Sequence, residues 1–171
     1  MQIIEALKHY RDNFSNNFIY EIVGGCNQKS NYYQEILKKI KDYNLDDKVF
    51  FRGKIINEKL REYYSSADLF IMTSININNY FEGFGLVFLE ANTKGVPCIG
   101  SVNSGCQEAI LNGKTGYVVD PYDSKGIAGK IDLILNKNTI KTLDCIDWAK
   151  KNDIKIKARE LVSFYDKRSG V

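Results

Sequence analysis

The hydrophobic positions along this chain alternate between two spacings. Short apolar runs, typical of buried strands, alternate with segments whose apolar residues recur every three or four positions, as on one face of a helix. The pattern predicts strands at residues 18–25, 48–53, 68–74, 96–101 and 116–120. It predicts helices at residues 2–14, 31–45, 57–67, 86–94, 105–113, 124–135 and 153–166. Such alternation indicates βαβ units with right-handed crossovers and a parallel sheet.

The expected fold is therefore an α/β, Rossmann-like, doubly wound parallel sheet with helices on both faces. We expect residues 1–171 to form a single domain, with residues 139–171 as a C-terminal helical segment. Within it, Trp148 and the tail that it begins (residues 148–167) are expected to pack against the sheet. The pattern opens with a helix, so the strand that normally starts such a domain is expected to be absent or supplied by something else. Ligands of these folds bind beyond the carboxyl ends of the strands.

Several helix ends also carry recognisable residues. Asn31 and Gln34 have the spacing of a capping box, and Ser124 is expected to cap the helix that follows it. Gly113 is expected to close the short helix before it.

The stretch "YFEGFGLVFLEANTKGVP" (residues 80–97) contains the most informative chemistry. Gly95 and Pro97 are typical of a helix end, and counting back from them starts the helix near Gly85 or Leu86. The free N–H groups of a helix start, next to glycines that permit close backbone approach, form an anion site. A phosphate or diphosphate is the natural ligand.

Two glutamates, Glu82 and Glu90, flank this helix start. Glu90 is surrounded in sequence by apolar residues, so we expect it to be buried, which is costly without a hydrogen-bond partner. The two hydroxyls of a ribose would supply two donors to one carboxylate. The pair fits a nucleoside diphosphate sugar. The alternative is that Glu82 is solvated and Glu90 is paired with a lysine or a backbone amide.

Composition excludes several classes of function. The 171 residues are 44% hydrophobic and 26% charged with a net charge of +3, and the charges are interleaved, so no nucleic-acid partner is expected. No apolar run approaches the roughly 20 residues that span a bilayer, and the amphipathic start predicts no secretory leader and a cytoplasmic location. The four cysteines show no C-x-x-C spacing, so we expect neither a metal site nor disulfides.

The segment "EGFGLVFLEANTKGVPCIGSVNSGCQEAILNGKTGYVVD" resembles the donor-binding motifs of family 4 retaining glycosyltransferases (glycosyl transferases group 1), which have the GT-B fold. That family's pattern is E-G-F-G-L-x-x-x-E-A, then G-x-P-V, G-G-x-x-E and G-x-T-G. Upstream, "FIYEIVGG", "KVFFRGKI" and "SSADLFIMTS" resemble its successive strands. The resemblance covers nearly the whole chain.

The resemblance implies a role for each matching residue. Glu82 would be catalytic, contacting the transferred sugar, and Glu90 would bind the ribose hydroxyls. The turn at Gly83, Phe84, Gly85 and Leu86 would hold the diphosphate through its backbone amides. The remaining donor-binding residues would be Gly24 and Gly25, in the nucleotide loop, and Gly53, Lys54 and Ile55, near the base.

The resemblance further implies sugar transfer from a nucleoside diphosphate sugar with retention, without a cofactor or metal, in polysaccharide or glycolipid biosynthesis. An N-terminal GT-B domain, in the full-length enzyme or as a separate chain, would supply the acceptor side, so we expect this chain alone to be inactive. The resemblance also allows peripheral membrane association of the full enzyme.

The chain departs from the family pattern in three ways. The family's first strand and its arginine–lysine pair are expected before Ile3, and Arg52 and Lys54 are the nearest candidates to replace that pair. Cys26 and Cys106 stand where the family has glycines.

A degenerate, non-enzymatic nucleotide-sugar-binding or interaction module is the alternative function. A sugar-nucleotide epimerase and a dehydrogenase fit less well, because the former generally lacks E-G-F-G and no G-x-G-x-x-G follows a first strand here.

Overall fold

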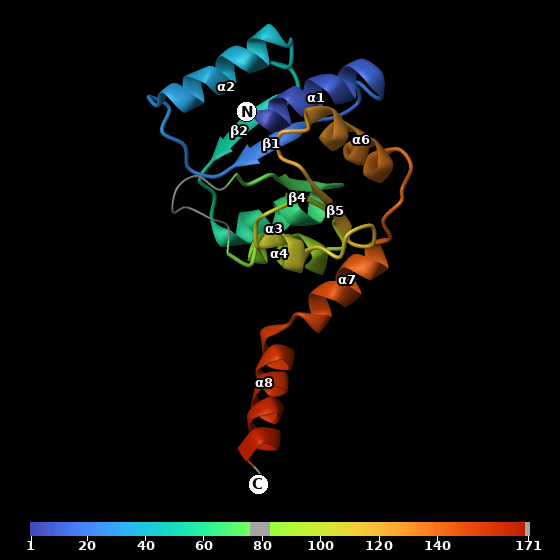
Figure 1. Ribbon diagram of the computed structural model, residues 1–171. Coiled ribbons are helices and arrows are strands. Elements are labelled where there is room, and N and C mark those ends of the chain that lie inside the picture. The colour runs from blue at the N-terminus through green and yellow to red at the C-terminus, as the bar shows by residue number, and fades with distance from the viewer. Residues whose placement is uncertain (76–82, 170–171) are drawn as a thin grey trace.

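The structure, a computed structural model, describes residues 1–75 and 83–169, with side chains in the last helix as far as residue 165. Helices and strands alternate as the hydrophobic pattern predicts (Figure 1). The strands are β1 (Tyr20–Val23), β2 (Val49–Gly53), β3 (Phe70–Met72), β4 (Cys98–Ser101) and β5 (Gly116–Val119). The helices are α1 (Gln2–Asn13), α2 (Asn31–Asp42), α3 (Asn57–Ser66), α4 (Leu86–Thr93), α5 (Cys106–Ala109), α6 (Ser124–Leu135), α7 (Thr142–Lys151) and α8 (Ile154–Ser169).

All strand pairs in the described residues are parallel, which confirms the predicted type of sheet. The hydrogen bonds divide the strands into two groups, β1–β2 and β3–β4–β5. Tyr20 lies opposite Val49 in the first group, and Cys98 lies between Phe70 and Gly116 in the second. Every parallel strand is followed by a helix, so the connections have the crossover form that parallel strands require.

Helices cover the strands from two sides (Figure 1). On the side of α1 and α6, one hydrophobic cluster takes side chains from all of β1 to β5. On the side of α3, α4, α5 and α7, a second cluster takes side chains only from β3, β4 and β5. Among the described residues, the group β3–β4–β5 is therefore covered on both faces, and the group β1–β2 is covered on one face.

The ends of three helices differ from the sequence predictions. Ser30, not Asn31, caps α2, because its side chain accepts a hydrogen bond from the Tyr33 N–H. Asp123, one residue before the predicted Ser124, caps α6 through the Gly126 N–H. Helix α5 ends at Ala109, so Gly113 lies in a later turn and does not close it. Neighbouring side chains that can each accept from an N–H two or three residues further along the chain compete for the cap, and spacing alone does not choose between them.

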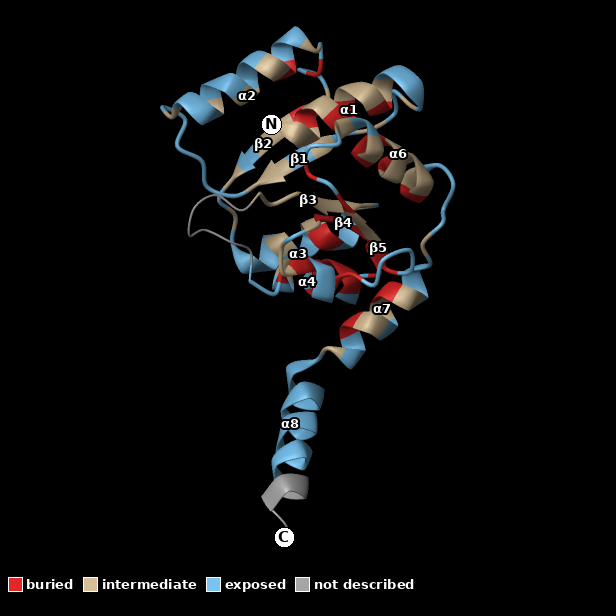
Figure 2. Ribbon diagram, viewed as in Figure 1, coloured by how far each residue is buried: buried red, intermediate tan, exposed pale blue. Residues whose placement is uncertain are grey.

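The C-terminal segment also departs from its predicted packing. The departure does not concern Trp148, which packs against the hydrophobic cluster on one face of β3, β4 and β5 and donates a hydrogen bond from Nε1 to the Ala109 carbonyl at 2.8 Å. Helix α8 extends away from the rest of the molecule, and its described side chains are exposed (Figure 2). The prediction that the whole tail packs against the sheet is therefore wrong for α8.

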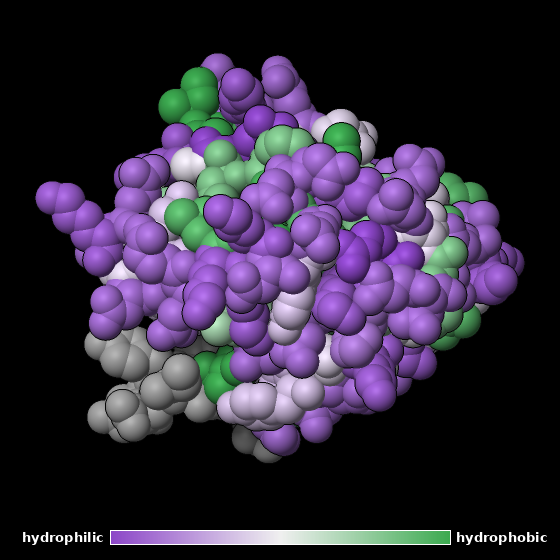
Figure 3. Space-filling view, turned by 90° about the horizontal axis from the view of Figure 1, so that it is seen from above, coloured by the Kyte–Doolittle hydropathy of each residue, from purple (hydrophilic) through white to green (hydrophobic). Residues whose placement is uncertain are grey.

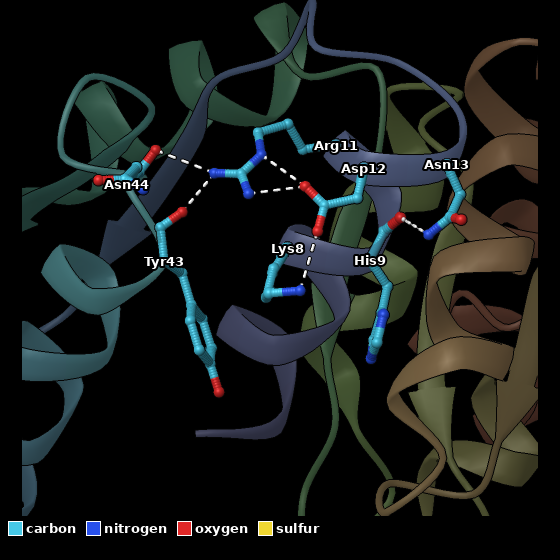
Figure 4. A network of polar contacts seen from close by, with 7 residues as sticks. All are labelled: Lys8, His9, Arg11, Asp12, Asn13, Tyr43 and Asn44. Carbon is cyan, nitrogen blue, oxygen red and sulfur yellow. Dashed lines mark hydrogen bonds and ion pairs between the residues drawn. The ribbon is translucent and has the colours of Figure 1, made fainter.

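An arginine joins α1 to the end of α2. Arg11 donates to the backbone carbonyls of Tyr43 and Asn44 and also contacts Asp12, which accepts a further hydrogen bond from Lys8 (Figure 4). A cation at the carboxyl end of a helix satisfies carbonyls that have no partner within the helix.

The molecular surface seen from above in Figure 3 is mostly hydrophilic, with scattered hydrophobic residues.

Candidate functional site

The predicted base-side residues meet where β1 and β2 end. Val23 lies opposite Gly53 in the sheet, and the Gly24 N–H donates to the Gly53 carbonyl at 2.9 Å. Gly53 has φ +68, in the left-handed region that favours glycine, and no atom lies within 4 Å of a Cβ built there. Gly25 and Lys54 are exposed beside this bond. The structure thus brings together Gly24, Gly25, Gly53, Lys54 and Ile55, at the end of the strands where ligands bind in such folds.

The predicted diphosphate residues lie at the start of α4. The helix begins at Leu86 after Gly85, as the sequence predicts. Within the described part of the chain, no side chain caps this end, so its first N–H groups remain available to a ligand. Gly83, Phe84 and Leu86 are all exposed beside it.

Gly85 is the residue that makes this helix start possible. Its φ of +75 and ψ of +48 are left-handed. A Cβ at this position would lie 2.8 Å from Cδ2 of Phe88 and 3.3 Å from Cα of Cys106. Because neither approach leaves room for a side chain, the turn depends on glycine, and it brings the start of α4 against the start of α5.

Glu90 is exposed, so the expectation of a buried carboxylate is wrong. Helix α4 does bury Phe88, Leu89, Ala91 and Asn92, but Glu90 lies on the side of the helix that the core leaves open. Its Oε2 atom accepts a hydrogen bond from the hydroxyl of Tyr64 on α3 at 3.3 Å. The partner is thus a tyrosine, and not the lysine or backbone amide of the alternative interpretation. The predicted catalytic residue, Glu82, lies outside the described residues.

A hollow of about 460 Å³ opens next to the start of α4. It is lined by Phe84, Leu86, Glu108, Asn152, Ile154 and Lys157. The resemblance predicted only the first two of these as site residues. Glu108 belongs to the stretch that resembles the family's G-G-x-x-E, and the sequence could have indicated it. Asn152 and Lys157 belong to no motif, and only the positions of α7 and α8 bring them here.

The two cysteines singled out in the sequence, Cys26 and Cys106, occupy different environments. Cys26 is exposed, whereas Cys106 is buried, with its Sγ 2.9 Å from the Ser101 carbonyl oxygen and 2.8 Å from Ser104 Oγ. Burial raises the pKa of the Cys98 thiol well above its usual value and that of Cys145 to about 11. Cys98 and Cys145 are therefore held as thiols, unlike reactive cysteines, which are thiolates. All four cysteines are free, as predicted.

Of the two basic residues considered as replacements for the family's pair, Arg52 is already engaged. Its Nε donates to Oε1 of Glu21 at 2.6 Å, and its guanidinium lies 5.1 Å from the centre of the Phe50 ring. Lys54 lies just beyond the carboxyl end of β2, next to Gly53, and is exposed. Among the described residues, Lys54 is the better placed of the two for a ligand.

Comparison with known proteins identifies the family. The family model described as "Glycosyl transferases group 1" matches residues 1–152. The chain belongs to this family of glycosyltransferases. N-acetyl-alpha-D-glucosaminyl L-malate synthase of Bacillus anthracis is 39% identical over 93 residues, which are 54% of this chain and 23% of that protein. Mannosylfructose-phosphate synthase of Agrobacterium fabrum is 32% identical over 108 residues, or 61% of this chain and 23% of the other.

Solved structures of glycosyltransferases share the fold. A glycosyltransferase of Rickettsia africae superposes with a TM-score of 0.78 at 22% identity, over 97% of this chain and 43% of its own. HepE of Anabaena, solved in complex with UDP, gives 0.76 at 20% identity, over 96% of this chain and 44% of its own. A C-terminal domain from Francisella tularensis gives 0.74 at 24% identity, over 88% of this chain and 76% of its own.

These matches confirm a Rossmann-like α/β domain that corresponds to the C-terminal half of a GT-B structure. The chain spans about a quarter of the curated relatives cited above and under half of the two longer structures. None of the described helices is both long and apolar enough to cross a membrane.

Proposed function

We propose that this glycosyltransferase domain binds a nucleoside diphosphate sugar across the carboxyl ends of its strands. The observation that carries the proposal is the arrangement on α4. A left-handed glycine opens the start of the helix, and Glu90, one turn further along, exposes its carboxylate. Oxygen acceptors for a diol and N–H donors for a diphosphate therefore stand on one short helix.

In the proposed complex each part of the donor meets a different element. The diphosphate lies at the start of α4 beside Gly83, Phe84, Gly85 and Leu86, the ribose hydroxyls donate to Glu90, and the base lies towards Gly24, Gly25, Gly53, Lys54 and Ile55. Glu82 contacts the sugar. Glu90 lies on α4, and the residues near the base lie at the ends of β1 and β2. The bound nucleoside would therefore extend from one group of strands to the other.

The reaction proposed for the whole enzyme is sugar transfer with retention of configuration. Hydrogen-bond donors at the start of α4 that are already oriented towards the leaving diphosphate would stabilise the negative charge that develops on it. No metal is required at this site. The acceptor side would come from an N-terminal domain like that of GT-B enzymes. Solved relatives support this division, because this chain covers only 43–44% of the length of full structures such as those from Rickettsia and Anabaena.

Titration calorimetry with UDP, GDP and ADP and with their sugars tests the proposal. We expect one nucleotide to bind and Glu90→Gln to weaken its binding about 10- to 100-fold, because a charge-assisted hydrogen bond to each hydroxyl is lost. Glu35→Gln on α2, another exposed helical glutamate, is the matched control and should bind as the unaltered chain does. Absence of binding by all of these ligands would contradict the proposal.

A transfer assay tests the division of labour. The chain alone should bind the donor and transfer no sugar to an acceptor, while addition of a GT-B N-terminal half should restore transfer. Transfer by the isolated chain would contradict the expected need for a second domain and leave the donor site intact.

A further inference from the structure

Tyr64 is the one described side chain whose hydroxyl bonds to the Glu90 carboxylate. It lies on the buried side of α3 and is only 9% exposed. Its ring packs edge-on against Phe70 of β3 with centroids 5.7 Å apart, and Phe70 packs in the same way against Phe88 of α4 at 5.3 Å. The ring is therefore held from behind by the core, while the hydroxyl reaches the edge of the proposed site.

We propose that Tyr64 is a positioning residue that orients Glu90 for the two ribose hydroxyls of the donor. This inference rests on the proposed function of Glu90. An ionised carboxylate offers about four lone-pair positions on its two oxygens. The tyrosine hydroxyl takes one on Oε2. Because the Glu90 side chain is exposed, the remaining positions are the ones to which a diol would donate.

The need for such a partner follows from the exposure of Glu90. A long side chain on a helix surface rotates freely, and fixing it for a ligand lowers its conformational entropy at the moment of binding. The hydrogen bond from the buried Tyr64 restricts the Glu90 side chain before the ligand binds, so less conformational entropy is lost on binding. The 3.3 Å distance is long for an O–H···O bond, for which about 2.7 Å is usual, and contacts of this kind tighten when the ligand arrives.

Tyr64 remains a donor over the whole range of pH in which the protein would work. Burial, and secondly the neighbouring Glu90 carboxylate, raise the pKa of the Tyr64 hydroxyl. The hydroxyl keeps its proton, so the direction of the hydrogen bond does not change. On the same helix, Thr93 donates to the Glu90 backbone carbonyl and not to its carboxylate.

Helix α3 also connects the two parts of the proposed site. It begins at Asn57, two residues after the base-side residue Ile55, and Tyr64 touches Glu90 two turns later. Helix α3 therefore links the position of the Glu90 carboxylate to that of the segment that follows β2.

The test is Tyr64→Phe, which keeps the buried ring and removes only the hydroxyl. Binding is measured by calorimetry for whichever of UDP, GDP and ADP binds the unaltered chain most tightly, and for its 2′,3′-dideoxy analogue. We expect the variant to bind the ribonucleotide about 3- to 10-fold more weakly and the dideoxy analogue unchanged. A merely structural role would weaken both ligands alike.

Two further variants complete the experiment. In the Glu90→Gln background, Tyr64→Phe should have little additional effect, because the carboxylate it orients is gone. Tyr63→Phe, the neighbouring tyrosine on α3, is the control and should leave both affinities unchanged. Equal losses for both ligands, no loss for the ribonucleotide, or full additivity with Glu90→Gln would each overturn the role of Tyr64 alone. Failure of the unaltered chain to bind any of the three nucleotides would overturn the proposed function and this inference with it.

Discussion

Strands β1 and β4 are of equal length and differ in how many of their faces are covered. All four residues of β4 are buried, whereas none of the four in β1 is fully buried. In β4, Cys98 and Ile99 belong to different hydrophobic clusters, one on each face. In β1, Tyr20 and Ile22 pack against the cluster under α1 and α6, while Glu21 is exposed on the other face.

The sequence of each group follows from this difference. A strand covered on both faces is apolar or small at every position, and a strand covered on one face alternates. On the face of β1–β2 that no described helix covers, Glu21 and Arg52 form an ion pair across the two strands. The apolar pairs of β3, β4 and β5 leave no place for such a charge. In the proposed site, the helix start belongs to α4, which follows β3 in the group covered on both faces. The loops near the base follow β1 and β2, in the group covered on one face.

The largest expected effect on this comparison comes from Gly116→Ala in β5. A Cβ there would lie 2.0 Å from the carbonyl oxygen of Cys98 on β4, and both strands are held between two layers of helices. Neither backbone can move aside, so we expect a loss of about 4 kcal/mol or more in the free energy of unfolding, or no folded protein. Urea denaturation followed by circular dichroism measures this. The control, Gly25→Ala at the end of β1, has open space around it and should change stability by less than about 0.5 kcal/mol.

A matched pair of isoleucines compares the two groups directly. Ile99 of β4 is 0% exposed, whereas Ile22 of β1 is only partly buried. We expect Ile99→Ala to lower the free energy of unfolding by about 3 to 4 kcal/mol and Ile22→Ala by about 1 to 2 kcal/mol, because the second leaves a smaller cavity. Equal losses in denaturant titrations would show that β1 is as tightly packed as β4.

The smallest expected effect concerns the surface of α1, near the once-covered strands. The hydrogen bond from Lys8, followed by that from Arg11, lowers the pKa of Asp12 (Figure 4). A carboxylate with a lowered pKa stabilises the folded state at pH values above its ordinary pKa of about 4, and this contribution disappears as the pH falls through its folded value.

Asp12→Asn should therefore cost about 0.5 kcal/mol or less at pH 7, since the ion pair is partly exposed, and less than that near pH 2. Denaturant titrations at the two pH values provide the measurement. Asp46→Asn, another exposed aspartate, serves as the control for the substitution itself. A cost that persists unchanged at low pH would mean that Asp12 acts through packing and not through its charge.

Much of the site could be predicted because its parts are local. Gly85, Gly95 and Pro97 delimit α4 through backbone conformation alone, so the helix start was predicted to within a residue. The helix caps at Ser30 and Asp123 were missed, because adjacent residues of similar chemistry compete for the same N–H groups. The exposure of Glu90 was also missed. The apolar residues beside it in sequence point to the core, and the eight-residue helix turns Glu90 away from them.

The sequence by itself determined the alternation of strands and helices, the parallel sheet and the chemistry of the α4 segment, since these depend on periodicity and on local backbone preferences. Only the tertiary structure decided which strands are covered twice, that Tyr64 reaches Glu90 and that α8 extends from the molecule. Each of these depends on which segments, far apart along the chain, come to lie in contact. A single sequence records the composition of each segment, but the partner it packs against is set by the folded arrangement of all of them.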